Sequence, residues 1–381
     1  MGIQPSLHLK TKSNQIYGLD FIRFAAAVLV AVYHFAFTNW VLPDRDLHAF
    51  LPATPGLPPG YQFTWFGWIG VQIFFALSGF VIAYSCQTET TRTFIIKRFL
   101  RLTPAMWISA TICGVLSVWL GFNTFSKAIL LTLKSAVFFP KGPWIGEQYW
   151  TLPVEVSFYA VLAIMLAVGW KESLERLAIV LALWSGAYWI TLSFGFRDPK
   201  TSWTQLLLLQ HGCHFALGLL LFCAVKDQLT PKRLAIMTVC VATGFLQIAA
   251  TEVHDVAPYA DRLPLAVPIG VWITAIALIY LSARYNMQAD RYLASHKKLI
   301  RQIGLLTYPL YLIHWHVGGA VLFLAHRASI GFGSAVVLAL LASIASSWLV
   351  TVFPEPVLKK LLAGCITPNS GRARKPLASV E

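Results

Sequence analysis

The sequence predicts an all-α, polytopic membrane protein: a helical bundle of about ten transmembrane helices with both termini in the cytoplasm. Of the 381 residues, 57% are hydrophobic and only 12% are charged, which leaves too little polar surface to cover a soluble globule. The apolar residues also gather into stretches of about 20, the length of a helix that crosses a bilayer. Finally, Arg23 and His34 lie inside the first stretch, and ionisable groups within a membrane helix mark functional positions.

Ten apolar stretches have the length and composition of crossings. They are residues 17–38, 64–86, 102–121, 150–169, 177–196, 204–225, 233–250, 265–283, 303–324 and 333–354. A further apolar stretch, 125–139, is short and carries Lys127 and Lys134. We expect it to be a re-entrant or interfacial helix on the external side, and an extra crossing is the alternative.

Basic residues predict the orientation, because they favour cytoplasmic loops. With the N-terminus inside, 21 of the 30 Lys and Arg residues are cytoplasmic and eight are external, while Arg23 is in the membrane. The net charge of +14 is then explained by topology and anionic lipid, and no nucleic-acid partner is expected. We divide the chain into a cytoplasmic N-terminal segment (1–16), a transmembrane domain (17–356) and a basic, disordered cytoplasmic tail (357–381).

Arg23 and His34 share one face of the first crossing. Their separation of eleven residues is close to three helical turns, or roughly 16 Å, so both side chains can line one cavity. Arg23 either contacts a ligand or pairs with Asp20, three residues earlier on the same helix.

Two clusters follow in the second and third crossings. The run from Gly70 to Phe80 contains Ser78 and Gly79, small residues that favour close helix packing. Arg98 and Arg101, one turn apart at the cytoplasmic end of the third crossing, can grip phosphates. Their alternative role is a positive anchor on the inner face.

Two further clusters belong to the fourth and ninth crossings. Glu155 lies near the outer end of a descending helix, at a depth similar to that of His34, so it can orient this imidazole as a base or form a structural ion pair. Pro309 interrupts the ninth crossing, which also carries His314 and Tyr308. His314 is either catalytic or a core histidine bonded to a neighbouring helix.

These motifs, in this order, resemble the acyltransferase 3 family of bacterial membrane acyltransferases. The resemblance rests on Arg23-x10-His34, the run Gly70 to Phe80, Arg98-x-x-Arg101, Trp150-x-Leu-x-x-Glu155-x-x-Phe158-Tyr159 and Tyr308-x-x-Tyr311-Leu312-x-His314. It implies a ten-helix domain in the bacterial inner membrane that moves an acyl group, usually acetyl from acetyl-CoA, to a carbohydrate hydroxyl. One departure is His316, where the family often has proline.

The resemblance and the predicted depths imply a layout in which Arg98 and Arg101 hold the CoA phosphates and the acyl arm passes Arg23 to reach His34. There His34 is a general base oriented by Glu155, or itself carries the acyl group. Ser78, Tyr159, Tyr308 and His314 are further candidates for the site. The expected partners are acyl-CoA, a carbohydrate acceptor and membrane lipids, and the six cysteines lack the spacing of a metal site.

Two other classes of protein also place charges inside the membrane. A transporter or flippase of a glycan or lipid intermediate would cleave no thioester. A catalytically silent sensor or assembly subunit would have no use for the complete set of Arg23, His34 and Glu155.

Overall fold

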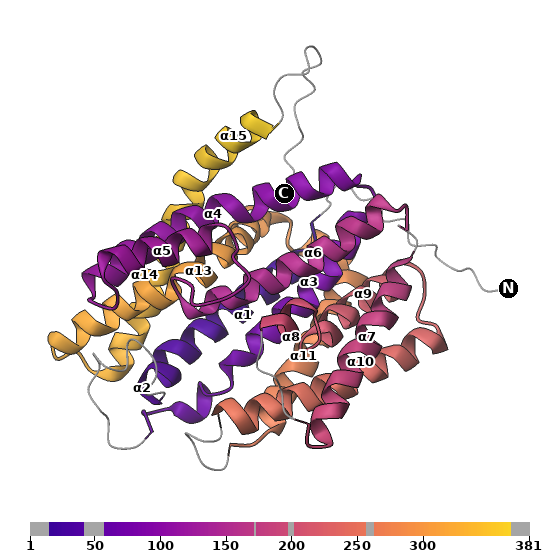
Figure 1. Ribbon diagram of the computed structural model, residues 1–381, viewed down its shortest axis with the longest axis horizontal. Coiled ribbons are helices and arrows are strands. Elements are labelled where there is room, and N and C mark those ends of the chain that lie inside the picture. Colours follow the sequence, from indigo (N-terminus) through magenta and orange to yellow (C-terminus); the bar gives the residue numbers. More distant parts are fainter. Residues whose placement is uncertain (1–14, 42–56, 171–172, 197–201, 257–262, 367–381) are drawn as a thin grey trace.

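The computed structural model describes residues 15–41, 57–170, 173–196, 202–256 and 263–366, and this part of the chain is a helical bundle without strands (Figure 1). The helices are α1 (Tyr17–Tyr33), α2 (Asn39–Val41), α3 (Gly70–Cys86), α4 (Thr91–Trp119), α5 (Phe125–Ala136), α6 (Thr151–Ala167), α7 (Leu174–Ser193), α8 (Ser202–Leu206), α9 (Gly212–Lys226), α10 (Pro231–Thr251), α11 (Ala266–Arg284), α12 (Asn286–Tyr292), α13 (Lys297–Arg327), α14 (Phe332–Val352) and α15 (Pro354–Ile366). Two π-helical turns, His34–Thr38 and Glu252–Val256, follow α1 and α10.

Every predicted crossing corresponds to a helix, and nine helical segments of the described chain are long and apolar enough to span a membrane. The exception in length is the stretch 204–225, which forms the short α8 and the 15-residue α9. Residues 212–225 of α9 are all buried. This helix is therefore packed inside the bundle rather than against lipid.

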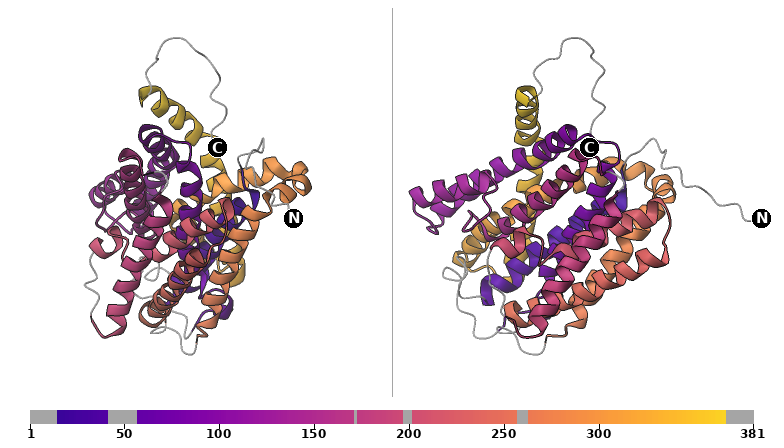
Figure 2. Two further views of the ribbon diagram at one scale, coloured as in Figure 1. Left: turned by 90° about the vertical axis from the view of Figure 1, so that its right-hand side faces the viewer. Right: turned by 45° about the vertical axis from the view of Figure 1, so that its right-hand side comes forward.

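The centre of the bundle is α1, which packs against α13, α3 and α11 (Figures 1 and 2). Gly304 of α13 lies so close to Asp20 that a Cβ atom there would be 2.7 Å from the Asp20 side chain, and Gly318 abuts Phe35 in the same way. These contacts pair the early turns of both helices and then their later turns, so α1 and α13 run parallel. In the ten-crossing scheme, where α9 counts as a crossing, the first and ninth crossings also run in the same direction.

Small residues allow α3 to approach α9. A Cβ atom on Gly218 would lie 2.1 Å from the Ala76 carbonyl oxygen, and one on Gly79 would lie 2.3 Å from that of Phe215. Such distances exclude any side chain at these two positions. The packing interpretation of the small-residue run is therefore confirmed at Gly79.

The stretch 125–139 forms α5, a helix of 12 residues that packs against α4 and is shorter than a membrane crossing requires. The indole Nε1 of Trp107 on α4 donates to the carbonyl of Ala136 at 3.0 Å, and Thr132 of α5 packs against Gly114 of α4. Hence α5 runs back along α4, antiparallel to it. The C-terminal end of α5 lies beside Trp107. Trp107 precedes the end of α4 by 12 residues, which is about 18 Å at 1.5 Å per residue.

Two sequence predictions need correction. The tail predicted to be disordered from residue 357 is helical up to Ile366. Its helix, α15, begins with Pro354, and proline suits the first helical turn. Glu355 also lies close to the positive end of the helix dipole, where a negative charge is stabilising. The remainder of that tail, and residues 1–14, lie outside the described residues. In the ninth crossing, Pro309 does not interrupt the helix, and α13 continues through it as one helix of 31 residues. A proline removes one backbone hydrogen bond, which is tolerated in a membrane helix because neighbouring groups can satisfy the freed carbonyl.

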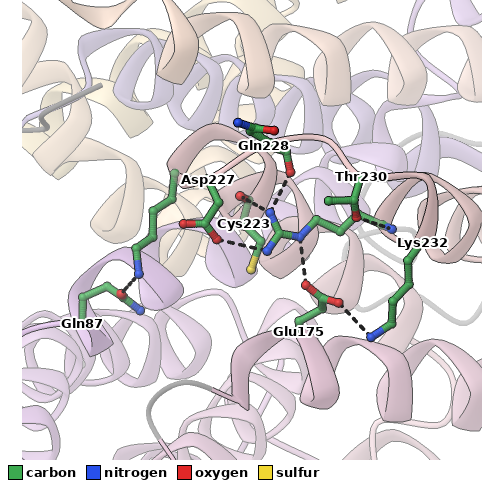
Figure 3. Close-up of polar contacts among 9 residues, drawn as sticks. Gln87, Glu175, Cys223, Asp227, Gln228, Thr230 and Lys232 are labelled. Atoms are coloured by element: carbon green, nitrogen blue, oxygen red, sulfur yellow. Dashed lines mark hydrogen bonds and ion pairs between the residues drawn. The ribbon is translucent and has the colours of Figure 1, made fainter. Parts of the chain in front are cut away.

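One polar cluster joins the ends of α7, α9 and α10 (Figure 3). Arg233 donates to Glu175 at 2.8 Å and to Asp227 at 3.0 Å, and also to the carbonyls of Cys223 and Gln228. Nearby, Lys226 donates to the Gln87 side chain at 2.6 Å, which ties α9 to the end of α3. These bonds tie the ends of α3, α7, α9 and α10 together, and none of the residues belongs to the predicted site.

Candidate active site

His34 and His314 face each other across the interface of α1 and α13. His34 Nδ1 lies 2.7 Å from His314 Nε2, and the two rings are nearly parallel, with an interplanar angle of 12°. His314 is fully buried, whereas His34 is half-buried. The edge-on ring of Trp315 also contacts His34, with 4.8 Å between the ring centroids.

The hydrogen bonds of His314 determine the tautomers of a neutral pair. His314 Nδ1 lies 2.8 Å from the carbonyl oxygen of Tyr311 and 3.1 Å from that of Leu310. Carbonyls only accept, so Nδ1 of His314 carries the proton and its Nε2 accepts. His34 must then donate from Nδ1, which leaves the lone pair on its Nε2. The arrangement is that of a base held in one tautomer and orientation by a buried partner.

A π-helical turn begins at His34. It spans His34–Thr38, and the backbone N–H of Asn39 bonds to the carbonyl of His34, five residues earlier. Turns of this kind insert one extra residue into a helix and occur frequently at functional sites. The widened turn lies on the side of His34 away from Arg23.

Glu155 belongs to a second polar group on α3 and α6. Its Oε1 accepts a hydrogen bond from Ser78 at 3.1 Å and another from the Tyr159 hydroxyl, one turn further along α6. Tyr308 of α13 interacts electrostatically with Glu155 and Tyr159. The structure therefore brings together Ser78, Glu155, Tyr159 and Tyr308, all of which the sequence analysis singled out.

The three candidate arginines lie near this polar group on α3, α6 and α13. Arg23 pairs with Asp20 at 3.1 Å and interacts electrostatically with Arg101, Tyr159 and Glu155. Arg98 interacts with Tyr159. All three arginines are half-buried. Both roles considered for Arg23 are thus compatible, because it pairs with Asp20 and also faces the other site residues.

The prediction that Glu155 lies at a depth similar to that of His34 is wrong. Gln148 donates to the carbonyl of Leu312 at 2.6 Å, and Thr151 bonds to the Tyr311 hydroxyl at 3.0 Å. The start of α6 therefore lies deep in the bundle, level with the middle of α13, because α5 runs back along α4 before α6 begins. Glu155, one turn later, is level with Tyr308, which precedes His314 by six residues, about 9 Å along the helix.

Three contacts of the site had no clear sequence signal. They are the packing of Trp315 on His34, the interaction of Arg101 with Glu355 and Lys359 of α15, and the bonds of Gln148 to α13. Trp315 stands beside His314 in the sequence, so its position was a weak hint. The other two depend on helix ends whose approach is set by the fold.

The bundle, its imidazole pair and its half-buried arginines define a polytopic membrane protein with ionisable groups among its membrane-length helices. A family model described as an acyltransferase domain matches residues 16–352. The chain therefore belongs to this acyltransferase family, as its motifs indicated.

Curated relatives cover parts of the chain. The peptidoglycan O-acetyltransferase OatA of Listeria monocytogenes is 26% identical over 300 residues, which are 67% of this chain and 46% of that protein. Nodulation protein 10 of Rhizobium leguminosarum is 29% identical over 143 residues, 32% of this chain and 39% of its own. The putative peptidoglycan O-acetyltransferase YrhL of Bacillus subtilis is 27% identical over 207 residues, 46% of this chain and 28% of its own. The matched regions thus span less than half of each relative, and no solved structure matches the chain.

Proposed function

We propose that this protein is an O-acetyltransferase of the bacterial inner membrane that moves an acetyl group from acetyl-CoA to a hydroxyl of a carbohydrate acceptor. The observation that carries the proposal is the contact between His34 Nδ1 and His314 Nε2. It supplies a half-buried imidazole whose basic nitrogen is set by a buried partner. Such an imidazole is suited to remove a proton from a hydroxyl during acyl transfer.

The donor enters between the arginines in this proposal. Arg98 and Arg101 lie one turn apart on α4, and guanidinium groups bind phosphate oxygens in a bidentate manner. The acyl arm then passes Arg23 and the group around Glu155 and ends at His34. Along α1, the eleven residues from Arg23 to His34 correspond to about 16 Å, which the narrow arm of the cofactor spans in an extended form.

The chemical step needs no group beyond those in the chain and the two substrates. His34 Nε2 takes the proton of the acceptor hydroxyl while its oxygen attacks the thioester carbonyl. The tetrahedral intermediate collapses, the carbon–sulfur bond breaks, and the proton passes from His34 to the CoA sulfur. His314 is a positioning residue in this scheme, because it holds His34 in the tautomer that presents Nε2.

The acceptor class follows from the relatives. Two of them are named as peptidoglycan O-acetyltransferases, one of these as putative, and peptidoglycan offers sugar hydroxyls. We therefore assign a carbohydrate hydroxyl to the acceptor position and a bilayer setting to the protein, in agreement with its nine membrane-length helices.

The test is an assay of the purified, detergent-solubilised protein with acetyl-CoA labelled in the acetyl group and a panel of glycans. We expect thiol release and transfer of label by the wild type, and loss of both in His34→Ala with unchanged folding. Turnover in His34→Ala equal to that of the wild type would refute the assigned base. Folded wild type that cleaves no acyl-CoA but moves a glycan lipid across vesicles would support the transporter class.

A further inference from the structure

Asn39 is a buried polar residue whose side-chain amide has no hydrogen-bond partner among the described residues. Its side chain is fully buried, yet neither Nδ2 nor Oδ1 makes a hydrogen bond within the part of the chain that the structure describes. Buried side-chain amides almost always have hydrogen-bond partners, so an exception calls for a reason. One such reason is a ligand group that completes the bonding during function.

The π-helical turn places Asn39 on the same face of the helix as His34. In an uninterrupted α-helix, residue 38 would lie one turn beyond His34 on the same face. The extra residue in the turn, marked by the bond from the Asn39 N–H to the His34 carbonyl, moves Asn39 to that position. By this helical geometry, Asn39 lies about 5 Å beyond His34 along the helix axis and on the same face of the helix.

The polar groups nearest to Asn39 along the chain are already engaged. The Thr38 hydroxyl donates to the His34 carbonyl at 3.4 Å, and the Trp40 indole donates to the Phe35 carbonyl at 2.7 Å. His314 bonds to His34 and to two carbonyls of its own helix. Among these residues, Asn39 keeps an N–H group available for a substrate.

We propose that Asn39 Nδ2 donates a hydrogen bond to the thioester carbonyl oxygen and stabilises the oxyanion that forms on it. This inference rests on the proposed function. As the acceptor oxygen bonds to the carbonyl carbon, the π electrons of the carbonyl move to its oxygen, and they return when the carbon–sulfur bond breaks. A fixed donor at this oxygen stabilises the transition state more than the bound thioester, because the charge exists only during the reaction.

The test replaces the amide by an apolar group of similar size. For Asn39→Leu we expect kcat to fall by about 10²- to 10³-fold, the usual effect of losing one oxyanion donor, while the KM for acetyl-CoA stays unchanged. The melting temperature should stay the same or rise, because the variant no longer buries an unsatisfied amide. Asn39→Asp keeps the shape but replaces the donor with an acceptor, so its kcat should fall at least as far.

A second asparagine provides the matched control. Asn123 donates to the Ser117 hydroxyl at 3.1 Å, near the end of α4, so Asn123→Leu should lower the melting temperature and leave kcat unchanged. If Asn39→Leu keeps the wild-type kcat, or loses activity only in proportion to folded protein, the inference is wrong. His34→Ala, assayed in parallel, separates the outcomes: activity lost there but kept in Asn39→Leu overturns this inference alone, and activity kept in both overturns the proposed function.

Discussion

The 2.7 Å contact between His34 Nδ1 and His314 Nε2 joins two residues that are 280 positions apart in the chain. His314 is held by two backbone carbonyls of its own helix, so its Nε2 is available only as an acceptor in the neutral pair. The proposed catalytic base thus depends on a partner from the ninth predicted crossing.

The first prediction concerns that partner. His314→Leu removes the acceptor for the His34 Nδ1 proton and frees the imidazole to change tautomer, so we expect kcat to fall by about 10²-fold or more with little change in the KM for acetyl-CoA. His314→Gln offers a side-chain oxygen to the same proton and should restore part of the rate. Steady-state kinetics on folded protein measures both effects, and equal rates in His314→Leu and wild type would contradict a positioning role.

The second prediction concerns the donor entrance. Replacing Arg98 and Arg101 together by Gln removes two charge-assisted contacts to phosphate, so the KM for acetyl-CoA should rise about tenfold or more, without a matching change for the acceptor. Lys97→Gln is the matched control, because Lys97 is on the same helix but pairs with Glu89 at 2.9 Å. An effect of the double variant on membrane insertion alone would indicate that the arginines only anchor the helix.

The third prediction tests the separation of the two polar groups. Glu155→Leu leaves the hydroxyls of Ser78 and Tyr159 without their acceptor and removes a negative charge beside Arg23, so we expect a loss of about 3 kcal/mol in the free energy of unfolding. Glu155→Gln keeps an acceptor and should cost less.

Additivity provides the decisive measurement for this separation. Because Glu155 and His314 lie about two turns apart in depth, Glu155→Gln and His314→Gln should change the unfolding free energy additively, to within about 0.5 kcal/mol. A larger coupling energy in the double variant would show that Glu155 acts through the histidine pair after all.

The fourth prediction concerns stability away from the site. Arg233→Met removes hydrogen bonds to two carboxylates and two carbonyls, so we expect a loss of about 2 kcal/mol in the free energy of unfolding, with unchanged activity per folded molecule. Lys232→Met should cost less than about 1 kcal/mol, because Lys232 shares the partner Glu175 but its side chain is 65% exposed. Reduced kcat in folded Arg233→Met would contradict a purely structural role.

Several features of the fold were predictable from the sequence because they depend on local chemistry. All ten apolar stretches lie on helices, since twenty apolar residues favour a helix in lipid whatever their neighbours are. The bounds differ most for 204–225, which is divided between α8 and α9, and for α4, which begins 11 residues before the predicted 102. The common faces of Arg23 with His34, and of Arg98 with Arg101, follow from helical periodicity alone. The pairing of Arg23 with Asp20 is equally local, as the two are three residues apart.

The tertiary structure decided which of these groups meet. The sequence predicts Glu155 at the depth of His34 if α6 starts at the membrane surface, but α5 runs back along α4 before α6 begins. The partner of His34 comes from α13, and no local rule selects one helix among nine. The position of Asn39 depends on a single widened turn. The sequence therefore determined which segments are helices and which residues share a helix face. Packing between distant helices determined the site, because side-chain contacts depend on the relative depth and rotation of the helices, which no single segment encodes.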